Sequence, residues 1–173
     1  MVSVADWSYA GNPSGVAFDN NATAIGTITL DLDDKKVGDA AQFTARMGFD
    51  LDITEDFSID YSQRFIDKLY AQLNADDFAI DPVTGAVSAD GSLQLPGYSL
   101  ADLGMTYRFN FDDDSRLSLR LNVNNLWNTE YIAESQTNIA AGLGDSTFQG
   151  INIDNKAFFG FGTTWNFTVR YSF

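Results

Sequence analysis

The sequence predicts an all-β protein made of long antiparallel strands. Apolar and polar residues alternate along several stretches of about ten residues, the spacing expected for strands with two different faces. Aromatic residues make up 14% of the chain, and 14 glycines accompany only 3 prolines, a composition that suits strands separated by turns. No run of apolar residues approaches the roughly 20 that a membrane-spanning helix requires.

Residues 164–173 show the alternation without exception. The apolar positions of this stretch are Trp165, Phe167, Val169, Tyr171 and Phe173. Because successive side chains of a strand point to opposite faces, the other face is polar and carries Arg170. One apolar, aromatic-rich face and one polar face are typical of a strand in an outer-membrane β-barrel.

Two further pairs of alternating stretches predict hairpins with short polar turns. They are 42–53 with 57–65, joined by the turn 54–56, and 101–109 with 117–123, joined by the turn 112–115. The longest of these stretches reach the roughly 9–11 residues with which a tilted strand crosses a bilayer. The alternation breaks at Asn124 and Asn125, which predicts either a bulge or the exit of the strand from the bilayer.

Long polar stretches separate these strands, at roughly 10–41, 71–97 and 128–163. Short turns at one edge and long loops at the other are expected in outer-membrane barrels, where the turns face the periplasm. A first strand at 2–9 brings the total to about six spanning strands in an antiparallel, up-and-down meander. Segments 25–32 and 149–159 are predicted to form extra hairpins beyond the membrane.

Composition and charge exclude several classes of function. The chain has 24 acidic and 10 basic residues, and the resulting charge of −14 repels a phosphate backbone, so we expect no nucleic-acid binding. It has no cysteine and no histidine, which removes thiolate sites and imidazole catalysis, so we expect no enzyme. Acidic clusters at 31–34, 76–77 and 112–114 lack the spacing of a calcium loop, and we assign no metal and no cofactor.

Every arginine falls on a polar position of a predicted strand. At the midplane of the lipid face an arginine costs about 2–4 kcal/mol, whereas on a lumen wall its guanidinium can bind carboxylates bidentately. We therefore expect a set of lumen-facing charges, namely Arg46, Asp50, Asp60, Arg64, Asp102, Arg108, Arg120 and Arg170. The alternative is that these charges form the solvated face of a soluble sheet.

Three stretches resemble the C-terminal barrel portion of a TonB-dependent receptor: 67–71, 124–132 and 164–173. The most specific is the second, in which Asn125, Leu126 and Trp127 are followed by Tyr131. In that family this pattern ends a late ascending strand and leads into the last extracellular loop. The likeness runs from about Asp39 to the end of the chain.

The resemblance implies a barrel of about 22 strands, plugged by an N-terminal domain, in the outer membrane of a Gram-negative bacterium. Its function would be TonB-driven import of a scarce ligand such as a ferric siderophore, cobalamin or a glycan. The implied partners are outer-membrane lipid, the remaining barrel and plug, TonB acting through the plug, and the barrel-assembly machinery. The assembly signal would be carried by Trp165, Phe167, Val169, Tyr171 and Phe173. No motif identifies ligand-contacting residues.

No plug domain, TonB-contacting segment or export signal is visible, and about six strands cannot close so wide a barrel. We therefore expect residues 1–173 to be the C-terminal part of a receptor barrel, incomplete on its own. One alternative is a self-contained barrel of about eight strands with a structural or porin-like role, formed if two loop hairpins also span. Another is a soluble β-rich binding protein, whose apolar side chains would point inward.

Overall fold

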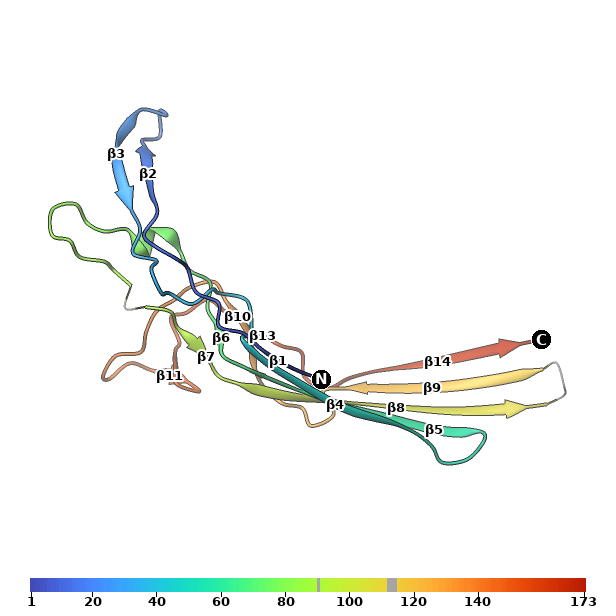
Figure 1. The fold of residues 1–173 in the computed structure, drawn as a ribbon. Helices are drawn as coiled ribbons and strands as arrows, with labels where there is room; N and C mark the ends of the chain where they lie inside the picture. The colour runs from blue at the N-terminus through green and yellow to red at the C-terminus, as the bar shows by residue number, and fades with distance from the viewer. Residues whose placement is uncertain (90, 112–114) are drawn as a thin grey trace.

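The structure is a computed structural model that describes residues 1–89, 91–111 and 115–173. Its main sheet has six strands in the order β1-β4-β5-β8-β9-β14, each antiparallel to its neighbours (Figure 1). The strands are β1 (Val2–Val4), β4 (Phe43–Asp52), β5 (Phe57–Asp67), β8 (Tyr98–Asn110), β9 (Arg116–Asn124) and β14 (Thr164–Ser172). The edge strands β1 and β14 do not pair with each other, so the sheet is open. The predicted all-β meander, incomplete as a barrel, is confirmed.

The pairing register places the apolar positions of five strands on one face. One row crosses β4, β5, β8, β9 and β14 through Leu51, Ile59, Met105, Leu121 and Phe167. No second layer of the described chain covers this face, and Leu51 and Phe167 are 50% and 53% exposed. An apolar face exposed over a whole sheet suits contact with lipid. It is the opposite of what the soluble alternative predicts.

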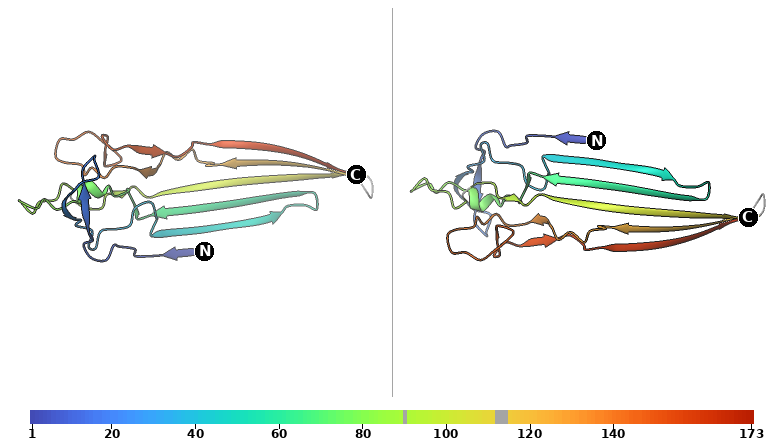
Figure 2. Two further views of the ribbon diagram at one scale, coloured as in Figure 1. Left: turned by 90° about the horizontal axis from the view of Figure 1, so that it is seen from above. Right: turned by 90° about the horizontal axis from the view of Figure 1, so that it is seen from below.

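The two ends of the main sheet differ, as Figure 2 shows. The C-terminus lies at the same end as the turns that follow β4 and β8. In the first turn, the Phe57 N–H donates a hydrogen bond to Thr54 Oγ1 at 3.0 Å. At the second, the Phe111 N–H donates to the Ser115 carbonyl at 3.0 Å, and the predicted turn residues 112–114 lie outside the described residues. The prediction that short turns and the C-terminus share one side is confirmed.

The opposite end carries a cluster of loops with short two-stranded ribbons and a short 3-10 helix (Figure 1). These elements are β2 (Ser14–Phe18) with β3 (Ala24–Thr29), β6 (Leu69–Tyr70) with β7 (Gln94–Leu95), β10 (Ile132–Ser135) with β13 (Ala157–Phe159), β11 (Thr147–Phe148) with β12 (Ile151–Asn152), and η1 (Ala75–Phe78). None of these ribbons joins the main sheet, so the strand count does not support a self-contained barrel. No described helix is long and apolar enough to cross a membrane.

The first predicted strand, 2–9, is wrong in length. Regular pairing covers only Val2–Val4, and Ser8 then forms an isolated bridge with Lys36. Between them, the carboxylate of Asp6 accepts a hydrogen bond from the ammonium of Lys36. This contact with the loop cluster draws the chain away from β4, which is why the alternation of the sequence does not continue as a strand.

The two extra hairpins are confirmed only in part. β3 lies mostly within 25–32, but its partner β2 comes earlier in the chain than the predicted range. β12 and β13 lie within 149–159, but they pair with β11 and β10 and not with each other. The reason is a tight turn at Gln149 and Gly150, whose φ angles of 50° and 85° suit a two-residue hairpin and fix β11 as the partner of β12.

The cluster of buried hydrophobic residues lies in the loop cluster and not in the main sheet. It consists of Leu69, Ala71, Leu95, Ile132 and Ile151. The sequence pattern did not predict this core, because four of its five members are single apolar residues within stretches assigned as polar loops. The long loops therefore pack on one another at the end of the sheet.

Asn125 fixes the point at which β9 ends and the loop cluster begins. It has a φ of 49°, a left-handed conformation that asparagine adopts more readily than most residues. Its Oδ1 accepts a hydrogen bond from the Thr129 N–H at 2.8 Å, and its Nδ2 donates to the carbonyls of Thr129 at 2.9 Å and Phe161 at 3.0 Å. Of the two interpretations of the broken alternation, strand exit is therefore confirmed and a bulge is not found.

We expect Asn125→Ala to destabilise this junction by about 1–3 kcal/mol, because buried backbone groups then lose their partners. Hydrogen–deuterium exchange of the detergent-solubilised protein should become faster at residues 126–131 and 161–163. The matched control is Asn124→Ala, since the exposed Asn124 side chain makes one 3.3 Å hydrogen bond, to Thr164 Oγ1. Equal exchange rates in both variants would contradict the role of Asn125.

Candidate functional site

The polar face of the main sheet carries an ion pair that crosses a strand. Asp60 Oδ1 on β5 lies 2.9 Å from Arg120 Nη2 on β9, although β8 runs between them. The β8 residue opposite Asp60 is Gly104, and a Cβ at this position would overlap the Asp60 carboxylate. The glycine therefore gives the acidic side chain room to reach its arginine. Arg120 also donates to Thr106 Oγ1 at 3.0 Å and to Asn122 Oδ1 at 2.8 Å.

A second ion pair joins Arg64 on β5 to Asp102 on β8, with 3.3 Å between Nη2 and Oδ2. The other oxygen of Asp102 accepts a hydrogen bond from the Asn125 N–H at 3.1 Å, so this carboxylate links the sheet to the strand exit. Both ion pairs are partly exposed, and exposed pairs contribute at most about 1 kcal/mol to stability. Their main effect is to fix the positions of the charged side chains.

The remaining charges predicted on this face make no ion pair among the described residues. Arg46 lies opposite Arg64, and Asp50 lies opposite Asp60, so each faces a like charge across the β4–β5 pair. The expectation that arginines bind the carboxylates of this face therefore holds for Asp60 and Asp102 but not for Asp50.

Arg108 and Arg170 lie on the same polar face, nearer the end that carries the turns. Arg108 is on β8 and Arg170 is on β14, and both lie opposite Ser118 of the intervening strand β9. The structure therefore places all eight predicted charges on one face of the sheet, with alternating strand positions deciding the side.

The predicted assembly signal lies on β14, the edge of the sheet. Its five residues, Trp165, Phe167, Val169, Tyr171 and Phe173, are between 53% and 96% exposed. The rings of Tyr171 and Phe173 lie 6.1 Å apart at the turn end, whereas Trp165 lies near the loop end. Aromatic residues at both ends of an apolar face match the two interfacial belts of membrane proteins. Recognition of this strand by assembly machinery stays a prediction.

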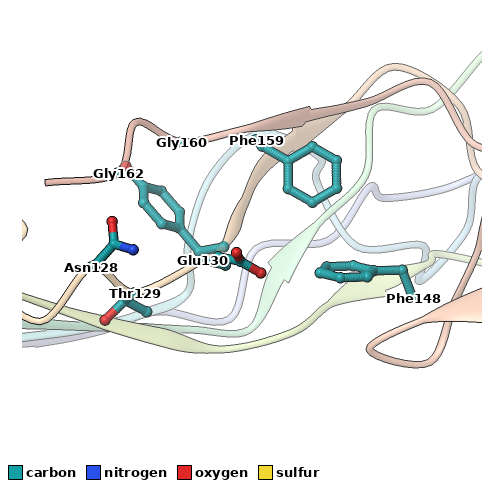
Figure 3. A pocket seen from close by; sticks show the side chains of 8 residues that line it. Asn128, Thr129, Glu130, Phe148, Phe159, Gly160 and Gly162 are labelled. Atoms are coloured by element: carbon teal, nitrogen blue, oxygen red, sulfur yellow. The ribbon is translucent and has the colours of Figure 1, made fainter.

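At the loop end, a cavity of about 400 Å³ opens between the segment that follows β9 and the strands near β13 (Figure 3). It is lined by Asn128, Thr129, Glu130, Tyr131, Phe148, Phe159, Gly160 and Gly162. Phe148 and Phe159 form an edge-to-face pair with ring centroids 5.3 Å apart, and the Glu130 carboxylate points toward them. A cavity with several aromatic rings and a few polar groups is typical of small-molecule sites.

Two residues hold the ring of Tyr131 at the wall of this cavity. The ring stacks on that of Tyr98, with centroids 4.3 Å apart, and the Gly160 N–H donates to the Tyr131 carbonyl at 3.0 Å. A Cβ at Gly160 would overlap the Tyr131 ring, so glycine is required there. The sequence analysis identified no ligand-contacting residue. The signal it missed is the alternation of glycine and phenylalanine in 158–162, which allows backbone to pass close to rings.

Acidic residues of the loops mainly stabilise turns. Asp19 accepts hydrogen bonds from the N–H groups of Thr23 at 2.8 Å and Asn21 at 2.9 Å, and these bonds lower the pKa of its carboxyl. The hydrogen bond from the Lys36 ammonium likewise lowers the pKa of Asp6. Within the described residues, no three acidic side chains come close enough to hold a metal ion, and the predicted acidic cluster 112–114 lies outside them.

Comparison with known proteins identifies a family. The model of the TonB dependent receptor-like β-barrel family matches residues 2–126. Among solved structures, the chain is similar to the ferric-catecholate import receptor Fiu from E. coli K12 in its closed form, at 18% identity and a TM-score of 0.49. That similarity covers 85% of this chain but only 17% of the length of the receptor. No curated protein matches the chain.

The matched region, 2–126, is well over half of the 173 residues. It includes five of the six strands of the main sheet, and only β14 and the last long loop lie beyond it. Members of this family are receptors and not enzymes, in agreement with the expectation drawn from composition, and they are typical of the Gram-negative outer membrane. The chain therefore belongs to the family of TonB-dependent receptor β-barrels.

Proposed function

We propose that residues 1–173 form the C-terminal part of a receptor barrel that imports a scarce ligand across the outer membrane of a Gram-negative bacterium. The ligand is of the siderophore, cobalamin or glycan class, and TonB supplies the energy through a plug domain. The observation that carries this proposal is the family match over a sheet that is apolar and exposed on one face and polar on the other.

The exposed apolar face supports a position in the lipid bilayer. Inside a bilayer every backbone polar group needs a partner in the protein, and an open sheet leaves those of its edge strands unpaired. The edges β1 and β14 therefore need further strands, which supports the remaining barrel as the partner of this segment. Outer-membrane lipid is the second partner, because the apolar rows are on the convex, lipid-facing side of such a barrel.

The opposite face then lines the lumen and contacts the plug. The lumen-facing charges in this proposal are Arg46, Asp50, Asp60, Arg64, Asp102, Arg108, Arg120 and Arg170. The ion pairs made by Arg64 and Arg120 support this assignment, since fixed guanidinium groups and carboxylates suit a wall that contacts another polar protein surface.

The cavity at the loop end supports a role in ligand capture. It lies at the end of the sheet opposite the short turns, where the loops of an outer-membrane barrel face the external medium. Its rings at Tyr131, Phe148 and Phe159 can stack on a planar or ring-shaped ligand group, and Glu130 adds a hydrogen-bond acceptor.

Uptake measurements test the proposed function. The gene for the receptor is deleted, and cells are supplied in turn with a radiolabelled ferric catecholate siderophore, cyanocobalamin and a maltodextrin. Loss of uptake of one probe, restored by the intact gene only in cells that have TonB, is the expected result. Uptake of all three probes at the parental rate in the deletion strain would contradict it.

We expect Phe148→Ala to weaken binding of the transported probe to the purified receptor by about tenfold, because truncating an aromatic anchor in a pocket costs roughly 1–2 kcal/mol. Equilibrium titration in detergent measures the change in Kd. The matched control is Phe18→Ala on β2, since that ring is 61% exposed and does not line the cavity. If both variants bind as tightly as the wild type, the cavity is not the capture site.

Assembly into the membrane tests the role of β14. We expect the double variant Tyr171→Ser with Phe173→Ser to lower the amount of folded receptor in the outer membrane several-fold, because both rings of the proposed signal are lost. Heat-modifiable migration on gels of isolated membranes measures the folded fraction. The control is Ser172→Ala, which changes the neighbouring residue on the polar face. Wild-type amounts of the double variant would argue against the signal.

A further inference from the structure

We propose that Arg108, Arg116 and Arg170 form a carboxylate-binding site that holds an acidic segment of the plug domain against the barrel wall. The proposal rests on the function proposed above, because it requires the polar face to line a lumen that a plug fills. It assigns a ligand class to a site at the end of the sheet opposite the loop cavity.

The three arginines border one cavity of about 320 Å³ on the polar face. The other lining residues are Thr106, Ser118 and Ser172. Arg108 and Arg170 lie on either side of β9 because both are opposite Ser118 in the register, and Arg116 is on β9 itself, nearer the turn. Three adjacent strands thus contribute one guanidinium each.

The chemistry of this cavity is one-sided. Every side chain that lines it carries a hydrogen-bond donor, and none is a carboxylate. Among the described residues, Arg108, Arg116 and Arg170 make no ion pair, and Arg116 donates only to the neutral Asn110 Oδ1, at 2.9 Å. Like charges on neighbouring strands destabilise a sheet, so an anion that binds here relieves a repulsion already present in the sheet.

The contrast with the rest of the polar face strengthens this inference. Arg64 and Arg120 each have a carboxylate of this chain within ion-pair distance. The chain carries 24 acidic residues, so acidic partners were available to the sequence, yet the described part of the chain places none in this cavity. The counter-charge therefore comes from outside the described chain.

The position of the cavity decides the occupant. It lies on the face opposite the exposed apolar rows, so lipid phosphate in contact with those rows cannot reach it. The planar guanidinium fork matches carboxylate geometry, and clustered arginines are the usual partners of acidic protein segments. An acidic segment of the plug satisfies both conditions, whereas a free anion would leave the cluster without a role in holding the plug.

The test uses the complete receptor in planar lipid bilayers, where a loosened plug appears as ion conductance. We expect the variant with Arg108, Arg116 and Arg170 all changed to Gln to show several-fold more frequent channel openings than the wild type. Arg170→Gln alone should give a smaller effect, and the three Arg→Lys changes together should restore much of the closure because they keep the charge. Raised salt should increase openings in the wild type, since screening weakens ion pairs.

Two controls separate this site from general effects of charge. Lys156→Gln removes one positive charge from an exposed loop residue and should leave conductance unchanged. Changing Asp112, Asp113 and Asp114 to Asn tests the acidic turn of this chain as the counter-charge, and wild-type conductance is expected. Heat-modifiable migration shows that each variant has folded, and the single Arg170→Gln change, at an exposed position, remains informative if the triple variant does not fold.

A folded triple variant with wild-type conductance would overturn the proposal, and so would openings in the acidic-turn variant that match those of the triple variant. A cluster that holds only a free anion gives the first of these results. Failure of the import function is distinguishable, because uptake of the three probes is measured separately. A receptor that imports none of them but opens on loss of the cluster refutes the ligand classes and supports this site.

Discussion

The structure depends on one constraint: a strand that crosses a membrane must satisfy its backbone hydrogen bonds with neighbouring strands while its two faces meet different surroundings. The register of the main sheet meets this constraint row by row. An apolar row runs from Leu51 to Phe167 across five strands, and the adjacent row on the other face runs from Asp50 through Gly104 to Asn166. A shift of one residue in any pair would exchange the two faces of that strand.

The polar face shows how a flat sheet can organise charge. Cross-strand neighbours alone would place Asp60 next to Asp50, and the absence of a Cβ at Gly104 lets Asp60 reach Arg120 two strands away. Near the turns the same face gathers guanidinium groups without a carboxylate of the described chain. The wall is thus divided into a part whose charges are balanced internally and a part suited to an external acidic partner.

The outer loops follow different rules from the sheet. Their buried core, their amide side chains and their ribbons are held by contacts between segments far apart in the sequence, such as Asn138 Oδ1, which accepts a hydrogen bond from the Leu93 N–H at 2.6 Å. The cavity beside Tyr131 exists because Asn125 and Gly160 bring the start of the last loop against its end. The proposed capture site is therefore a product of loop packing on a fixed strand exit.

The sequence by itself determined the strands with strict alternation, their two faces, the side of every arginine and the family resemblance, because a period of two residues is a local property of the backbone. It could not determine the length of the first strand, the partners of β3 and β12, or the aromatic cavity. Those depend on which distant segments meet. Only the tertiary structure decided them, since the contact of Asp6 with Lys36 and the packing of Ile132 with Leu95 join residues that no local pattern connects.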